Sequence, residues 1–155
     1  MSTSVDNTPA DGDSAVGAPV EEAIPTWSEL GVDDDIVAAL ESKGIVAPFP
    51  VQALTVADAL QGRDVCGKAK TGSGKTLAFG IPMIQRLAHD PDRRSPIAIA
   101  LVPTRELCVQ VAEELTPLAA ARSLRILAIY GGANMDSQIA ALGKGIDVVV
   151  ATPGR

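Results

Sequence analysis

The stretch Ala-Lys-Thr-Gly-Ser-Gly-Lys-Thr at residues 69–76 constrains this chain more than any other part of its sequence. A short apolar run at 64–67 precedes it, and a helix-compatible run at 77–81 follows it. A strand, a glycine-containing loop and a helix in this order are typical of a loop that wraps around a phosphate group, although Ala69 stands where the general pattern has Gly. The alternative is a Gly/Ser-rich turn that happens to carry a lysine, and the flanking runs argue against it.

The residue types in this loop suit a nucleoside triphosphate. Gly72 and Gly74 allow the backbone to curl so that successive N–H groups point at one anion, and the following helix adds its positive end. Lys75 can reach the β- and γ-phosphates, and the hydroxyl of Thr76 can ligate Mg²⁺. We therefore predict catalytic roles for Lys75 and Thr76. The predicted nucleotide-binding residues of the loop are Thr71, Gly72, Ser73, Gly74, Lys75 and Thr76.

The charge of the chain is unevenly distributed. The net charge is −6, and residues 1–25 contribute five acidic residues and no Lys or Arg. This acidic balance argues against a nonspecific nucleic-acid coat, but it leaves room for a local phosphate-binding surface built from backbone N–H groups. Residues 1–25 also lack periodicity and are rich in small and polar residues, so we predict a disordered acidic tail followed by a domain at 26–155.

Several features point to a cytoplasmic protein. The N-terminus does not have a basic start followed by an apolar stretch, and no apolar run approaches the length needed to cross a membrane. Cys66 and Cys108 are the only cysteines, and neither has a second cysteine nearby in the sequence. We expect both to be small buried side chains in a reducing compartment rather than metal ligands or a redox pair.

Apolar runs and amphipathic segments alternate along the rest of the chain. Such alternation predicts an α/β fold with a parallel sheet covered on both faces. The predicted strands are 64–67, 97–102, 125–130 and 146–151, and the predicted helices are 36–40, 51–60, 74–88, 104–121 and 135–142.

The loops that follow the predicted strands share one chemical character. Ligands of open parallel sheets bind at the carboxyl ends of the strands. The three later strands run into 103–107, 131–132 and 152–155, which carry Thr, Gly and two arginines. Each loop alone is ordinary turn and cap chemistry. Together with 69–76 they favour a longer polyphosphate, such as a nucleic-acid backbone.

These motifs, taken in order, resemble the first RecA-like domain of a DEAD-box RNA helicase. The loop 69–76 is similar to the family's nucleotide-binding motif, which also begins with Ala. The run Pro-Thr-Arg-Glu-Leu at 103–107 is similar to a motif that contacts RNA backbone, and 131–132 and 152–155 resemble the next two RNA-facing motifs. Upstream, Gly44, Pro48 and Gln52 match the spacing of an adenine-reading segment. The resemblance covers 27–155 and implies a P-loop NTPase that uses ATP and Mg²⁺ and binds RNA.

The resemblance also implies roles for individual residues. The carboxamide of Gln52 would pair with adenine, and Trp27 would offer a face to the base, although packing at the edge of the core is an open alternative for Trp27. Two positions depart from the family pattern: Ile45 stands where Phe is usual, and Lys70 where Gln is common. The residues implied to contact RNA are Pro103, Thr104, Arg105, Gly131, Gly132, Thr152, Pro153, Gly154 and Arg155.

The family continues beyond these motifs to an Asp-Glu-Ala-Asp segment and a second RecA-like domain, and neither occurs in residues 1–155. We therefore interpret 26–155 as the N-terminal part of the first domain, and expect the 155-residue chain alone to be poorly stable and inactive as an ATPase. One alternative is a truncated, nonenzymatic nucleotide- or RNA-binding module. A DNA helicase or a small-molecule kinase is a further alternative, which the motifs at 103–107 and 152–155 and the Gln52 segment argue against.

Overall fold

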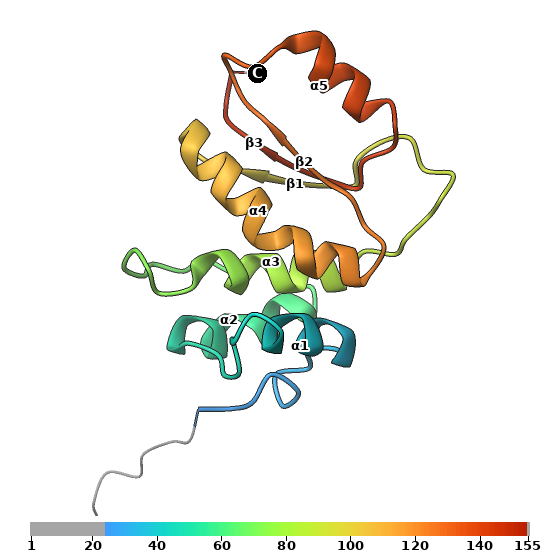
Figure 1. Cartoon of the computed structure of the whole chain (residues 1–155). Coiled ribbons are helices and arrows are strands. Elements are labelled where there is room, and N and C mark those ends of the chain that lie inside the picture. Colours follow the sequence, from blue (N-terminus) through green and yellow to red (C-terminus); the bar gives the residue numbers. More distant parts are fainter. Residues whose placement is uncertain (1–23, 155) are drawn as a thin grey trace, which may run out of the picture.

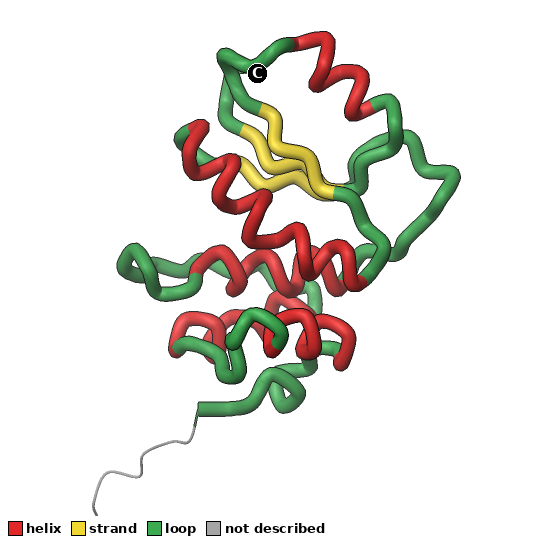
Figure 2. Tube along the Cα trace, viewed as in Figure 1, coloured by secondary structure: helices red, strands yellow, loops and turns green. Residues whose placement is uncertain are grey.

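The computed structural model describes residues 24–154, so the predicted tail lies outside the described residues except for its last two positions, and Arg155 also lies outside them. Five helices and three strands follow one another in this part of the chain (Figures 1 and 2). They are α1 (Asp34–Glu41), α2 (Pro50–Leu60), α3 (Lys75–Gln85), β1 (Ala98–Leu101), α4 (Arg105–Ala121), β2 (Ile126–Ile129), α5 (Met135–Leu142) and β3 (Val148–Ala151). Each of the described helices is too short or too polar to cross a membrane.

The three strands form a parallel sheet in the order β1-β3-β2. The last strand in the sequence is therefore the central one, and all four of its residues are buried. Because side chains alternate between the two faces of a strand, Val150 belongs to the main core on the α4 side, whereas Val149 and Ala151 belong to a smaller core on the α5 side. A near-continuous run of Val and Ala suits a strand that is covered on both faces.

Helix α4 joins the sheet to the other helices. It lies between the sheet and α3 and also packs against α1, and α2 packs against α3 (Figure 1). The buried residues of α4 recur every three or four positions, which places them on one stripe of the helix. They are Cys108, Val111, Ala112, Leu115, Leu118 and Ala119. Burial raises the pKa of the Cys108 thiol, and its Sγ donates to the carbonyl of Val150 at 3.1 Å.

The predicted α/β fold with a parallel sheet is confirmed, and most predicted elements form within a few residues of their predicted bounds. The predicted strand at 64–67 is wrong. Residues 63–70 form neither helix nor strand, and the expectation that Cys66 is buried is wrong for the same reason. A strand needs a neighbour for its N–H and C=O groups, and no strand in the described part of the chain pairs with this segment.

An ionic cluster ties the ends of three helices together. Arg122, directly after α4, pairs through Nη2 with Asp33 and with Asp35 at 3.0 Å, and its Nη1 donates to the Gln85 carbonyl at 3.2 Å. Gln85, at the end of α3, donates to the carbonyl of Gly31 at 2.8 Å. Burial opposes the charge of Arg122, but the hydrogen bonds and the attraction of both carboxylates outweigh it and raise the pKa of the guanidinium. The cluster therefore fastens α1 to α3 and α4.

We expect Arg122→Ala to lower the free energy of unfolding by about 1–3 kcal/mol, because it removes several charged hydrogen bonds around a side chain that is only 20% exposed. The matched control is Arg63→Ala, which breaks a pair with Asp58 in which the arginine is 65% exposed, and which should change stability by less than about 0.5 kcal/mol. Urea unfolding followed by circular dichroism measures both. Equal losses for the two variants would show that the cluster does not fasten the helices.

Candidate nucleotide and nucleic-acid site

The loop at 69–76 closes on the side chain of its own lysine. Helix α3 begins at Lys75, directly after Gly74, whose φ of 84° places it in the left-handed region. The Lys75 ammonium donates to the carbonyls of Ala69 at 2.7 Å and Lys70 at 2.5 Å, and the Ser73 hydroxyl also donates to the Lys70 carbonyl at 2.7 Å. The Lys75 ammonium and the first N–H groups of α3 therefore both lie next to this loop, where they could bind an anion. A bound anion would compete with the two carbonyls for the ammonium.

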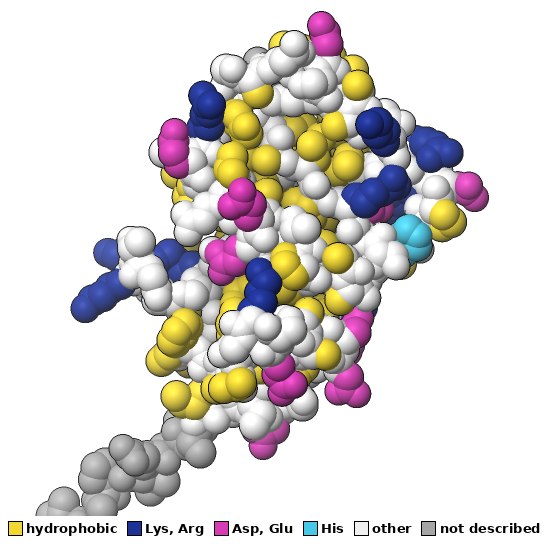
Figure 3. Space-filling model, in the orientation of Figure 1, with side chains coloured by type: hydrophobic (Ala, Val, Ile, Leu, Met, Phe, Trp, Pro, Cys, Tyr) yellow, Lys and Arg dark blue, Asp and Glu magenta, His cyan; other side chains and the backbone are white. Residues whose placement is uncertain are grey.

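The surface around this loop is basic and open to solvent. Lys68, Lys70 and Lys75 are all exposed. In Figure 3, Lys and Arg side chains project from the molecule on the side where the loop leads into α3 in Figure 1. A cluster of this kind attracts phosphate groups in spite of the acidic balance of the whole chain.

Gln52 connects the loop to helix α2. Its side chain is 0% exposed. Its Oε1 accepts from the N–H of Phe49 at 2.6 Å, and its Nε2 donates to the carbonyl of Gly74 at 2.9 Å. The first bond satisfies a free N–H at the start of α2, and the second anchors the residue that precedes α3. The pairing of Gln52 with adenine stays a prediction, and its contact with the loop is a role that the sequence did not reveal.

Trp27 lies in the core. Its side chain is 2% exposed, and the indole N–H donates to the carbonyl of Ile45 at 3.2 Å. A ring that is covered in this way offers no face to a base. The structure therefore favours packing, the alternative that the sequence left open, over the predicted contact with a nucleotide. The reason is physical: Trp is the largest apolar side chain of the chain, and it fills the space beside α1.

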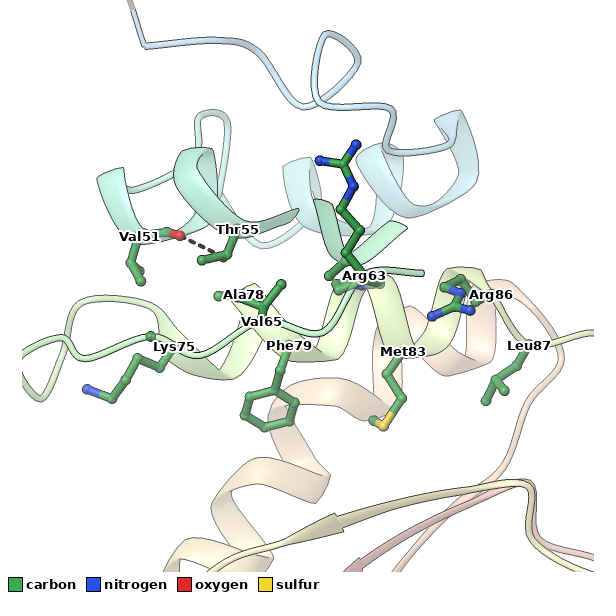
Figure 4. A pocket seen from close by; sticks show the side chains of 13 residues that line it. Val51, Thr55, Arg63, Val65, Lys75, Ala78, Phe79, Met83, Arg86 and Leu87 are labelled. Atoms are coloured by element: carbon green, nitrogen blue, oxygen red, sulfur yellow. Dashed lines mark hydrogen bonds between the residues drawn. The ribbon is translucent and has the colours of Figure 1, made fainter. Parts of the chain in front are cut away.

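An apolar cavity of about 480 Å³ lies next to the loop, between α2, α3 and the segment 63–67 (Figure 4). Phe79 and Met83 extend in the same direction from α3, whereas the ammonium of Lys75 points away from them. Phe79 is 40% exposed. Lys75 and Gly67 also line the cavity, but most of its lining is apolar and the Lys75 ammonium is bonded to the carbonyls of Ala69 and Lys70, so the cavity lies beside the candidate phosphate loop and does not coincide with it. It marks a face of α3 that the described residues leave partly uncovered.

A second group of predicted residues meets at the carboxyl edge of the sheet. Because the three strands are parallel, the residues after β1, β2 and β3 lie at the same edge. The hydroxyl of Thr104 accepts from the N–H of Leu107 at 3.2 Å and so caps α4. The N–H of Thr152 donates to the carbonyl of Ile129 at 3.0 Å, which extends the sheet by one bond. The residues of this edge that are exposed are Pro103, Thr104, Arg105, Gly131, Gly132, Pro153 and Gly154, and Thr152 is half-buried.

One contact at this edge involves a residue that sequence reasoning missed. The guanidinium carbon of Arg105 lies 5.2 Å from the centre of the Tyr130 ring. Tyr130 follows β2 and is the only tyrosine of the chain, and its carbonyl accepts from Nε2 of Gln138 in α5 at 3.2 Å. The sequence feature that could have indicated this contact is the aromatic residue Tyr130 directly before two glycines at the end of a predicted strand.

The fit of Mg²⁺ depends on the nucleotide. Within residues 24–154, no group of three or more His, Cys, Asp or Glu side chains is placed to hold a metal ion. Mg²⁺ commonly keeps several waters and binds through one or two protein oxygens together with phosphate oxygens. The half-buried Thr76 suits that mode, because it is the second residue of α3 and directly follows Lys75 at the end of the candidate phosphate loop.

Comparison with known proteins identifies the relatives of this chain. The family model "DEAD/DEAH box helicase" matches residues 49–155. The chain belongs to the DEAD/DEAH box helicase family. It is 43% identical over 148 residues to the pre-mRNA-processing ATP-dependent RNA helicase prp-5 of Neurospora crassa, covering 94% of this chain and 12% of that protein. It is 45% identical over 130 residues to the DEAD-box ATP-dependent RNA helicase CshA of Bacillus cereus, covering 84% of this chain and 24% of that protein.

A solved helicase-family structure has the same fold. The DEAD box protein of the hyperthermophile Methanococcus jannaschii superimposes with a TM-score of 0.75 at 38% identity, over 84% of this chain and 35% of that one. The resemblance to the N-terminal part of a first RecA-like domain is thus confirmed. The chain spans about a quarter or less of the length of these two curated helicases.

The geometry around Gly74 predicts that this helicase loop depends on Gln52. An added Cβ at Gly74 would overlap Nε2 of Gln52 and lie 2.8 Å from the Phe49 ring, whereas one at Gly72, which has a similar positive φ, would meet nothing within 4 Å. We expect Gly74→Ala to destabilise the chain by about 1–2 kcal/mol more than Gly72→Ala, because only the former displaces Gln52. Thermal unfolding of both variants measures the difference. If the two variants lose the same stability, the positive φ of the glycines alone explains the loss, and the contact with Gln52 contributes nothing.

Proposed function

We propose that this chain binds ATP with Mg²⁺ and the backbone of RNA as part of an ATP-dependent RNA helicase, in which ATP hydrolysis is coupled to RNA unwinding or remodelling. The observation that carries the proposal is the presence, on one chain, of a lysine-containing loop at the start of α3 and a separate row of phosphate-compatible loops at the carboxyl edge of the sheet. The family membership supports it.

The nucleotide half of the proposal uses residues 71–76 and Gln52. The N–H groups of the loop and the Lys75 ammonium would hold the β- and γ-phosphates, and Thr76 would ligate Mg²⁺. The metal would neutralise charge that develops on the phosphates during transfer. Gln52 would read adenine once its side chain, which is 0% exposed here, leaves its bonds to Phe49 and Gly74 and turns toward the nucleotide.

The RNA half uses the carboxyl edge of the sheet. The N-terminus of α4 with Thr104 and Arg105, the glycines at 131–132 and the loop after β3 would contact phosphates and sugars, together with Arg155, which lies outside the described residues. Contacts to the backbone position a nucleic acid without reading its bases. Binding should therefore show little sequence preference.

The domain that contains these residues is proposed to be larger than 26–155. The cavity beside α3 and the segment 64–67, which pairs with no strand among residues 24–154, support further strands packing there, and a second RecA-like domain would face the nucleotide. We propose a cytoplasmic location on the sequence grounds given above.

We expect Lys75→Ala to reduce the affinity for ATP by at least about tenfold, because the variant loses the ammonium at the start of α3 that would reach the β- and γ-phosphates, and Lys70, the other lysine of the loop, stands five positions earlier. Isothermal titration with ATP and Mg²⁺ measures the affinity, and circular dichroism checks that the fold is unchanged. The control is Lys68→Ala, which removes a nearby exposed charge outside the loop. Unchanged ATP affinity in Lys75→Ala would refute the role of the loop.

The alternative is a nonenzymatic nucleotide- or RNA-binding module, and hydrolysis separates the two. The residues 1–155 contain no acidic motif that could orient an attacking water, so the isolated 155-residue chain should release no phosphate from ATP above background, with or without RNA. A colorimetric phosphate assay makes the measurement. Robust RNA-stimulated phosphate release from this chain would contradict the expectation that residues outside 1–155 orient the attacking water.

A further inference from the structure

Arg105 is held by an aromatic ring rather than by a carboxylate. Its guanidinium carbon lies 5.2 Å from the ring centre of Tyr130, and its side chain is exposed at the start of α4. Among residues 24–154, no Asp or Glu forms an ion pair with it. The only charge-compensating contact found for this guanidinium in the described part of the chain is therefore the face of Tyr130.

Whether a carboxylate or an aromatic ring holds Arg105 decides whether its guanidinium can still bind an anion. A carboxylate would occupy two of the five N–H donors of a guanidinium and cancel its charge. A ring holds the guanidinium through its face, by a cation–π interaction, and leaves the N–H donors at the edge of the plane free. The side chain loses rotational freedom before the ligand arrives, and its charge remains available.

The surroundings of Tyr130 keep the pair in place. Gln138, which is buried in α5, donates to the Tyr130 carbonyl at 3.2 Å. Gly132, two residues after Tyr130, has a φ of 87°, and an added Cβ would lie 3.3 Å from Nη1 of Arg105. The end of β2 thus supplies both a ring that holds the guanidinium and a gap beside it. A larger residue at 132 would press on Arg105 and strain the backbone.

We propose that Tyr130 is a positioning residue for RNA binding, which presents the guanidinium of Arg105 to a phosphodiester at the carboxyl edge of the sheet. This inference rests on the proposed RNA-binding function. Tyr130 joins two loops that are far apart in sequence, at the starts of α4 and α5, into one phosphate site. The ring acts through Arg105 and does not itself contact the phosphate.

The test uses fluorescence anisotropy with a fluorescein-labelled, single-stranded uridine oligonucleotide at fixed salt, with ATP and Mg²⁺ in excess. We expect Tyr130→Leu to weaken RNA binding by about three- to tenfold, and Tyr130→Phe, which keeps the ring, to stay within about twofold of the original chain. In an Arg105→Ala background, Tyr130→Leu should have no further effect. The control is Arg125→Ala, which removes an exposed arginine at the amino end of the same strand.

Fluorinated phenylalanines at position 130 provide a second readout that preserves ring shape. Each added fluorine weakens the negative face of the ring, so RNA affinity should fall stepwise with fluorination. This series tests the proposal even if Tyr130→Leu does not fold. Equal binding across the series, or an undiminished effect of Tyr130→Leu in the Arg105→Ala background, would overturn it. If the original chain binds no RNA, the proposed function itself fails. If Arg105→Ala weakens binding but the ring variants do not, only the role of Tyr130 fails.

Discussion

The parallel pairing of β3 with β1 on one side and β2 on the other is the interaction on which the rest of the structure depends. Residues 148–151 are the last strand in the sequence and the central one in the sheet, so the sheet forms only when segments about fifty residues apart come together. Once paired, the strands direct their carboxyl ends to one edge. That edge places Arg105, Tyr130 and Gly132 beside one another, and it leaves α4 and α5 to cover opposite faces.

The candidate phosphate loop at 69–76 is held by a different kind of interaction. The segment before it has no strand partner in the described part of the chain, so backbone pairing does not position residues 69–74. Helix α2 supplies the support instead, through the buried amide of Gln52, which bonds to Phe49 and Gly74. Side-chain bonds of this type are individually modest, and their removal leaves a buried polar group without a partner, which is more costly. The loop is therefore coupled to the packing of α2 on α3.

Sequence reasoning succeeded where local pattern decides structure. The amphipathic stripe of α4 and the continuous apolar run of β3 have the same period in the sequence as in the fold, so both elements could be predicted. It failed where the partner lies elsewhere in the chain. The run at 64–67 has strand composition but no neighbour, and Trp27 could pack in the core or face a base until its surroundings were known.

The sequence by itself determined the family and the candidate phosphate loop at 69–76, because motifs at fixed spacing encode local backbone geometry and the donors that it presents. Only the tertiary structure decided which residues of the chain contact one another. Three contacts link positions that are distant in sequence. Trp27 is buried in the core, Gln52 donates to the Gly74 carbonyl, and the guanidinium of Arg105 lies over the ring of Tyr130. The physical reason is that such contacts depend on how helices and strands pack, and periodicity within one element carries no record of its neighbours.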